Sequence, residues 1–264
     1  MKLIIGNKKK AHIFTSIFQN LNRFTVDINI YFKKTELYIQ GMDTSHCSMF
    51  EIILKKEWFE DYICDSECFI GINALILYKI FNTKQENQII VLEYSEENSD
   101  KLEICFKNLE PVENEFSKEF SVPLMDIDSE LLQIPDVEYD IFVNINTKSF
   151  STMVSQLEIF SDVVQLVYEE NELSLNGDGD NGKIKILLKD SKNNNLNKCE
   201  IETEDDMKLL YSTKYISDFC SFSKINSKVN IMFKDGMPMV VHYELEDNEN
   251  SYVKFYLAPK IDND

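Results

Sequence analysis

The segment Glu36-Leu37-Tyr38-Ile39-Gln40-Gly41 recurs later in the chain as Glu172-Leu173-Ser174-Leu175-Asn176-Gly177. Further pairs keep nearly the same separation: 11–21 with 150–160, 73–81 with 213–222, and 89–94 with 229–233. A constant separation of about 140 residues indicates an internal duplication rather than chance similarity. The sequence therefore predicts an α+β protein built from two similar domains.

Strand patterns rich in β-branched and aromatic residues dominate the chain. They cover residues 37–40, 47–54, 89–94, 102–106, 163–168, 183–188, 229–233, 239–245 and 253–257. Glycine-containing turn signals at residues 176–179 and 235–236 separate some of them.

Four segments carry helical patterns. Residues 12–22 and 148–160 each place apolar side chains at i, i+3, i+4 and i+7, which predicts an amphipathic helix with one buried stripe. Residues 73–81 and 213–222 are shorter candidates. We therefore expect two helices in each domain.

A connector separates the two halves. Residues 121–135 hold two prolines and three acids without a clean period, which predicts an extended segment. Its apolar residues Leu131, Leu132 and Ile134 lead us to expect that it lies against a domain surface. The predicted domains are residues 1–120 and 136–264.

Composition excludes several classes of protein. The chain has 264 residues and a net charge of −19, which argues against indiscriminate binding to nucleic acid. No apolar run is long enough for a transmembrane helix or a signal peptide, so we expect a soluble, intracellular protein without membrane contacts. The six scattered cysteines are expected to be reduced.

No motif for catalysis or metal binding is present. The chain lacks a Walker motif, a zinc signature and a nucleophile elbow. The segment Asp178-Gly179-Asp180-Asn181-Gly182 hints at a calcium loop, but lysines stand where that loop needs glycine and glutamate. His46 beside Ser45 has no orienting acid. We predict no enzyme activity, no catalytic residue, no metal and no cofactor.

Several motifs occur in a recognisable order. Gln40-Gly41-Met42-Asp43-Thr44-Ser45-His46, the connector from Leu124 to Pro135, and the ending Tyr256-Leu257-Ala258-Pro259-Lys260-Ile261 resemble the proliferating cell nuclear antigen family, the eukaryotic-type sliding clamps of DNA replication. The resemblance spreads over nearly the whole chain. It implies duplicated DNA-clamp domains, with antiparallel sheets outside and helices lining the hole of a head-to-tail homotrimeric ring.

The resemblance also implies how such a ring works. It encircles double-stranded DNA without sequence specificity and acts as a DNA polymerase processivity factor, so weak phosphate contacts that permit sliding are enough. Subunits would join by pairing the strand near residues 115–123 with the strand near 182–188 of a neighbour. Candidate DNA-binding residues are Lys10, Arg23, Lys79, Lys84, Lys148, Lys214 and Lys224.

Thr15, Ser16 and Asn22 stand on the first helix where the family carries lysines, and Glu158 lies on the third. We therefore expect a less positive inner surface than in relatives. Lys8-Lys9-Lys10, expected just before the first helix, would compensate.

In this family a short peptide from DNA polymerase, clamp loader, nuclease or ligase plugs an apolar pocket with aromatic side chains. The matching positions are Met42, His46, Ile127, Leu132, Ile134, Pro238, Tyr256, Ala258, Pro259, Lys260 and Ile261. Two alternatives stay open: a subunit of a heterotrimeric checkpoint-type clamp, or a clamp-like polymerase accessory protein acting as monomer or dimer. The family default for localisation is the nucleus, or a cytoplasmic replication site if the source is a virus.

Overall fold

The computed structural model describes residues 1–95, 100–108, 110, 113–114, 116–128, 130–188, 198–203, 205–245 and 248–261. The chain divides into two compact units. Unit 1 comprises residues 1–44, 51–133 and 245–253, and unit 2 comprises residues 45–50, 134–244 and 254–264. Glu115 and Ser129, which belong to the predicted edge strand and connector, lie outside the described residues.

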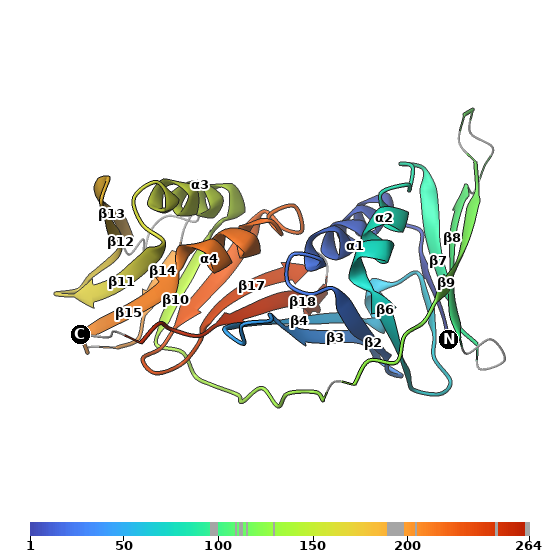
Figure 1. Cartoon of the computed structure of the whole chain (residues 1–264), viewed down its shortest axis with the longest axis horizontal. Coiled ribbons are helices and arrows are strands. Elements are labelled where there is room, and N and C mark those ends of the chain that lie inside the picture. The colour runs from blue at the N-terminus through green and yellow to red at the C-terminus, as the bar shows by residue number, and fades with distance from the viewer. Residues whose placement is uncertain are drawn as a thin grey trace. The chain divides into compact units, whose positions relative to one another are not determined.

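Unit 1 contains two antiparallel sheets (Figure 1). The first has the order β5-β1-β7-β8-β9, with bounds Asp61–Ile63, Lys2–Ile5, Gln88–Glu93, Lys101–Asn108 and Lys118–Pro123. The second has the order β4-β3-β2-β6, with bounds Ser48–Lys55, Glu36–Met42, Asp27–Phe32 and Cys68–Asn73. β18 (Asn248–Leu257) pairs with the outer edge of β4, where the Lys55 N–H donates to the Ser251 hydroxyl over 2.9 Å.

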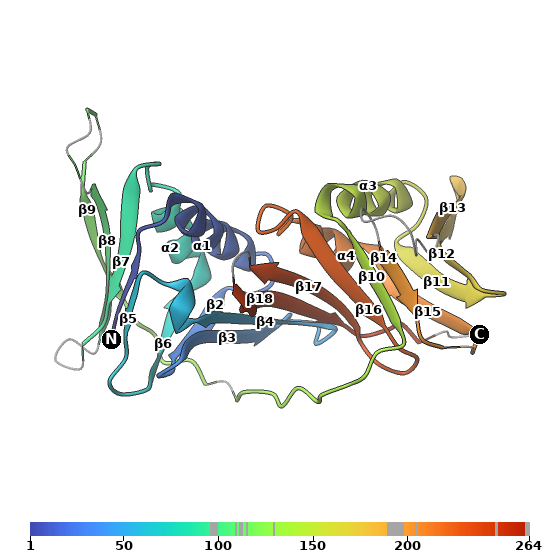
Figure 2. The same cartoon turned by 180° about the vertical axis from the view of Figure 1, so that it is seen from behind.

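Unit 2 repeats this plan (Figure 2). One sheet runs β14-β10-β16-β17 and continues into β18, with bounds Lys198–Ile201, Ile141–Asn146, Lys228–Phe233 and Met239–Leu245 for the first four strands. The other runs β13-β12-β11-β15, with bounds Gly182–Leu188, Glu172–Gly179, Val163–Glu169 and Met207–Ser212. The repeated strand order confirms the predicted duplicated α+β clamp fold.

Each unit places a pair of helices on its sheets. They are α1 (Lys8–Leu21) and α2 (Ala74–Phe81) in unit 1, and α3 (Thr147–Glu158) and α4 (Thr213–Cys220) in unit 2. Side chains cap three of the four N-termini: Asn7, Asn73 and Asn146 each accept hydrogen bonds from backbone N–H groups of the first turn. Ser212, the equivalent residue at α4, makes no such bond.

Aromatic side chains fill the space between helices and sheets. In unit 1, Phe14 and Phe18 of α1 contact Phe81 of α2 with ring centroids 5.5 and 5.3 Å apart. Trp58, in the 3-10 helix η1 (Lys56–Trp58), is fully buried, and its ring centroid lies 6.3 Å from that of Phe14. In unit 2, Phe255 stacks on Phe219 at 4.6 Å. These contacts bury the apolar stripes that the helical periodicity predicted.

Two local predictions were wrong. The first helix begins at Lys8 rather than at residue 12, because Asn7 caps the lysine-containing turn. Residues 176–179, predicted as a turn, belong to β12, and the chain turns after Gly179, which pairs with Gly182. The glycines serve close packing there: a Cβ on Gly179 would lie 2.0 Å from the Phe160 carbonyl oxygen. The turn predicted at Asp235-Gly236 is present, with Gly236 at φ 68°.

The connector leaves unit 1 along the edge of β6. The Met125 N–H donates to the Gly71 carbonyl, and the Asn29 side chain donates to the Ile127 carbonyl. The backbone of this segment therefore lies on the sheet, as expected. The side chains of Leu131 and Leu132 do not: they are 44% and 45% exposed, because only the Leu132 backbone is held.

No helix within the described residues is long and apolar enough to cross a membrane. Those residues also contain no group of three or more His, Cys, Asp or Glu side chains arranged to hold a metal ion. All six cysteines are free thiols.

The caps give a direct test of the fold. We expect Asn146→Ala to lower the free energy of unfolding by about 1 kcal/mol, because the Lys148 and Ser149 N–H groups lose their acceptor. Ser212→Ala is the matched control and should cost clearly less. Urea denaturation followed by circular dichroism measures both, and equal losses would contradict the capping assignment.

Candidate nucleic-acid interface and partner site

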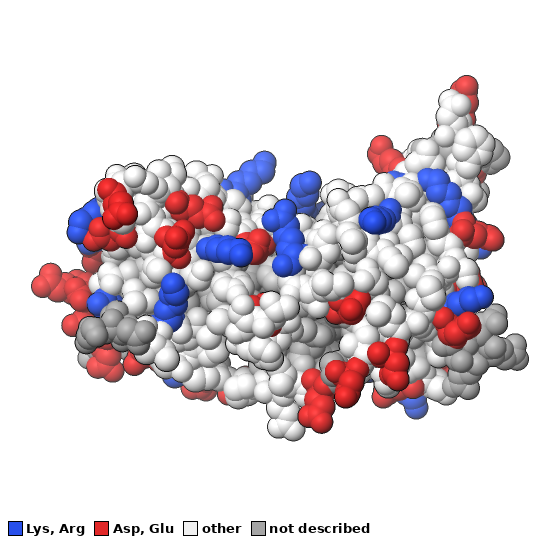
Figure 3. All heavy atoms as spheres, viewed as in Figure 1, with Lys and Arg blue, Asp and Glu red and all other residues white. Residues whose placement is uncertain are grey.

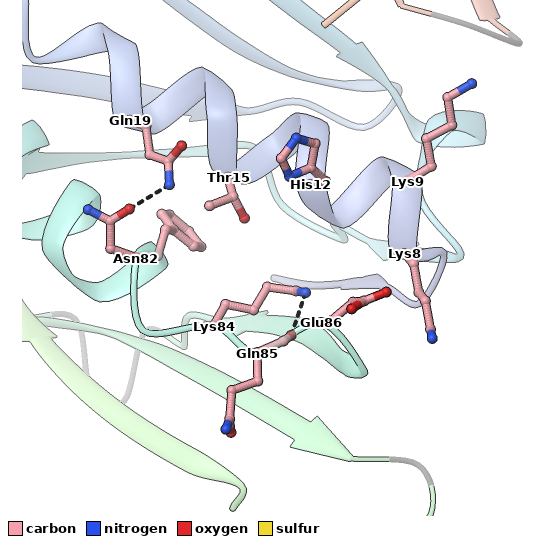
Figure 4. Close-up of a pocket in the computed structure, with 10 residues that line it drawn as sticks. Lys8, Lys9, His12, Thr15, Gln19, Asn82, Lys84, Gln85 and Glu86 are labelled. Atoms are coloured by element: carbon pink, nitrogen blue, oxygen red, sulfur yellow. Dashed lines mark hydrogen bonds between the residues drawn. The ribbon is translucent and has the colours of Figure 1, made fainter. Parts of the chain in front are cut away.

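A pocket of about 540 Å³ opens between α1 and the segment that follows α2 (Figure 4). It is lined by Lys8, Lys9, His12, Thr15, Gln19, Phe81, Asn82, Lys84, Gln85 and Glu86. The Gln19 amide donates to the Asn82 side chain over 2.5 Å, which ties the two walls together. The Lys84 ammonium donates to the Gln85 carbonyl over 2.9 Å. The lining includes three lysines and one carboxylate, so an excess of positive charge favours an anion there.

The lysines at the start of α1 lie at the helix N-terminus, where positive charge is electrostatically unfavourable. Lys8, Lys9 and Lys10 occupy the first turn, where the helix already carries partial positive charge and where no acidic residue is present. Lys8 donates to the Asn87 side chain over 2.6 Å. A cationic cluster added to a helix N-terminus concentrates positive potential at one point of the surface.

The predicted basic residues occupy different settings. Lys84 lines the pocket, whereas the Lys10 ammonium lies 5.7 Å from the ring centroid of buried Trp58 and is half-buried. Arg23 and Lys79 are exposed at the C-terminal end of α1 and on α2, respectively. In unit 2, Lys148, Lys214 and Lys224 are exposed in α3, in α4 and after α4.

Several pocket residues were not predicted as site residues, among them His12, Gln19 and Asn82. Asn7 could have indicated that the first helix starts at Lys8, because an asparagine before a run of lysines marks a helix start. Figure 3 shows that basic side chains of unit 1 gather mainly on the side carrying α1 and α2, while acidic ones gather along the strands and connector. Acidic side chains also lie beside α3.

Several residues predicted for the partner site belong to unit 1. In unit 1, the Gln40 side chain holds Leu132 by two hydrogen bonds: it accepts from the Leu132 N–H over 2.7 Å and donates to the Leu132 carbonyl over 2.9 Å. Met42 is half-buried at the end of β3. The Ile127 side chain packs over Gly71, where a Cβ would lie 2.9 Å from it.

In unit 2, the loop residues and the C-terminal segment are fixed by their backbones. The Ala258 N–H donates to the Cys47 carbonyl over 3.0 Å, next to His46, which has φ 56° and is exposed. The Lys260 N–H donates to the Leu210 carbonyl over 2.7 Å.

The remaining positions differ in exposure. The Pro238 carbonyl accepts from the Tyr139 hydroxyl over 3.2 Å. Ile134, Tyr256 and Pro259 are half-buried, and Ile261 is 85% exposed. Partly exposed apolar side chains on a fixed backbone suit the capture of apolar peptide groups.

Comparisons with known proteins agree with this geometry. Residues 6–131 match the family model described as "Proliferating cell nuclear antigen, N-terminal domain", and residues 133–260 match "Proliferating cell nuclear antigen, C-terminal domain". The chain is 30% identical over 260 residues to the proliferating cell nuclear antigen of Chaetomium thermophilum, covering 97% of each chain. It is 27% identical over 256 residues to that of Caenorhabditis elegans, covering 96% of this chain and 95% of the relative.

The Gln40 bonds can be tested by hydrogen exchange. We expect Gln40→Ala to speed exchange of the Leu132 amide, because it removes that amide's acceptor and the donor to its carbonyl. Gln19→Ala, which breaks a side-chain bond to Asn82, should leave the Leu132 amide unchanged. Mass spectrometry of peptides covering residues 130–134 measures the rate, and an unchanged rate in Gln40→Ala would refute the anchoring role.

Proposed function

The chain belongs to the proliferating cell nuclear antigen family and is a DNA sliding clamp, a processivity factor for DNA polymerase, and we propose that it acts as a closed head-to-tail homotrimer. Two domains, residues 1–120 and 136–264, would be joined by the connector 121–135. Three chains then supply six similar domains around duplex DNA. The edges of two terminal strands are the main observation that supports this proposal.

Two terminal strands are suited to joining subunits. β9 ends one sheet of unit 1 and β13 ends one sheet of unit 2, and no further strand of the described chain joins either outer edge. β4 holds the place equivalent to β13 in the duplicated plan, and there β18 covers the edge. Pairing β9 with β13 of a neighbour would satisfy both edges in the same way.

The surfaces of these strands support the pairing. Phe120 of β9 and Ile184 and Ile186 of β13 are half-buried in the single chain. Adding a strand beside them would remove more of this apolar surface from water, which stabilises association by about 25 cal/mol per Å² before the cost of association is subtracted.

We propose that the helix side faces DNA. The pocket lysines Lys8, Lys9 and Lys84 would contact backbone phosphates, together with Arg23, Lys79, Lys148, Lys214 and Lys224. Lys10 would act less directly, since its ammonium lies over Trp58. Such contacts are weak and independent of sequence, which permits sliding.

We further propose that the predicted partner site binds peptides of polymerases, clamp loaders, nucleases and ligases. The held backbones of Leu132 and Ala258 and the half-buried Met42 and Tyr256 support it. The chain would have no catalytic activity and need no cofactor, because its task is to tether other enzymes. The relatives' names support the nucleus as its compartment, and a viral source would instead favour a cytoplasmic replication site.

Solution mass tests the ring. We expect light scattering to give about three times 30.9 kDa at every concentration tested, because closed rings resist dilution. Ile186→Asp should reduce the mass to one chain, since a charge on the β13 edge opposes burial. Val26→Asp, at an exposed site outside both edges, is the control. A mass of one or two chains for the native protein would contradict the homotrimer and favour a role in a heterotrimeric clamp or as an accessory protein.

Salt dependence tests the DNA contacts. For Lys8→Ala combined with Lys84→Ala, we expect weaker binding to a short duplex and a slope of log K against log salt shallower by up to about 0.9 per lysine. Lys2→Ala is the control, because Lys2 pairs with Glu93 over 2.7 Å on β1. Fluorescence anisotropy at several salt concentrations measures the slopes. Equal effects in the two proteins would exclude the pocket as a phosphate contact.

A further inference from the structure

Three aromatic residues form a ladder across the outward face of unit 1. Tyr38 on β3 stands opposite Tyr31 on β2, and Tyr31 stands opposite Phe69 on β6. The ring centroids are 6.2 Å apart in the first pair and 5.6 Å apart in the second, which is stacked. Tyr38 is buried, Tyr31 is half-buried, and Phe69 is 57% exposed. The ladder thus ends in a large apolar side chain in water.

The neighbouring row of the same face is already covered. Two residues along each strand, Gln40 holds Leu132, Asn29 holds Ile127, and Gly71 lies under Ile127. The connector therefore crosses the sheet directly beside the aromatic ladder. The ladder is continuous with a surface that already receives an extended segment.

The edge of β6 is open where Phe69 stands. β6 is the terminal strand of its sheet, and among the described residues its outer side is met by an isolated bridge between Gly71 and Met125. The Met125 N–H donates to the Gly71 carbonyl, so the backbone groups of residue 71 point outward. Because this direction alternates along a strand, the backbone N–H and carbonyl of Phe69 point outward as well.

Negative charge flanks both ends of this open stretch. Asp65 and Glu67 precede β6, and Asp126 and Asp128 follow Met125 in the connector; all four are exposed. The nearby Lys33 is engaged with Glu36 over 3.1 Å, and Lys34 is the opposing exposed cation at the end of β2. The surroundings therefore favour a basic occupant.

We propose that the edge of β6 at Phe69 is a second docking site, which takes an extended basic segment of a partner protein by strand addition. The segment would pair with the outward backbone groups of Phe69. One of its aliphatic side chains would pack on the Phe69 and Tyr31 rings, and its lysines or arginines would face the four acids. This site adjoins Ile127 and Leu132 of the predicted partner site, uses Phe69 and Tyr31 that were not predicted there, and differs from the β9 and β13 edges.

A matched set of peptides tests the proposal. The probe is a fluorescein-labelled Lys-Val-Lys-Leu-Lys-Val-Lys peptide, and the control of equal charge is Lys-Gly-Lys-Gly-Lys-Gly-Lys. A third peptide carries the probe sequence with alternate backbone amides N-methylated. We expect the full-length protein to bind the probe at least about tenfold more tightly than either other peptide, because both apolar packing and backbone pairing contribute.

Variants locate the site. Phe69→Ala should remove the preference for the probe and leave the solution mass unchanged, whereas Ile159→Ala, at a 62% exposed residue of unit 2, should retain the preference. Circular dichroism checks that both variants fold. Equal binding of all three peptides, or an unchanged preference in Phe69→Ala, would overturn the proposal. Concentration-dependent growth in mass that Phe69→Ala abolishes would assign the edge to a second copy instead.

Discussion

The backbone edges of the sheets are the constraint on which the rest of this molecule depends. Each terminal strand presents N–H and carbonyl groups that need partners. The chain covers some of them itself: β18 lies on β4, the connector meets Gly71 on β6, and the C-terminal segment meets Leu210 on β15. We propose that other chains pair with the edges of β9 and β13 and with the edge of β6 at Phe69. In this proposal, assembly and partner binding both supply hydrogen-bond partners for the N–H and carbonyl groups of strand edges.

The duplication explains why the covered edges resemble one another. Gly71 of β6 and Leu210 of β15 hold equivalent places, and each carbonyl accepts an N–H from the segment that follows the last strand of its unit, at Met125 and Lys260 respectively. The same backbone hydrogen bond, present in both repeats, positions the connector in one unit and the C-terminal segment in the other. Both segments contribute residues to the proposed partner site, so that site follows from how the repeated fold closes its own edges.

Much of this fold was predictable from the sequence because its signals are local and periodic. The apolar stripe of Phe14, Ile17 and Phe18 identified α1, and the repeated strand patterns identified the duplication. One error was local, because Asn7 caps the first turn of α1 and sets the helix start at Lys8. The other arose from a contact between residues farther apart in the sequence. The glycine at 179 suggested a turn, yet it is required by the approach of the Phe160 carbonyl, which no local pattern reveals. The pocket at Lys84 and the ladder ending at Phe69 depend on tertiary neighbours in the same way.

A clamp with a net charge of −19 has to hold DNA without attracting it strongly. In a closed ring the DNA cannot leave sideways, so its retention does not depend on binding affinity. Each phosphate contact then mainly affects the friction of sliding and the salt dependence of binding. A chain with few inner cations then loses little retention. In the proposed ring, the inner cations lie at the start of α1, at Lys84 and on α2, α3 and α4, and the acids of the strand face would repel DNA from the outside. In the proposed ring, the uneven charge distribution would therefore favour DNA in the hole over DNA bound to the outer surface.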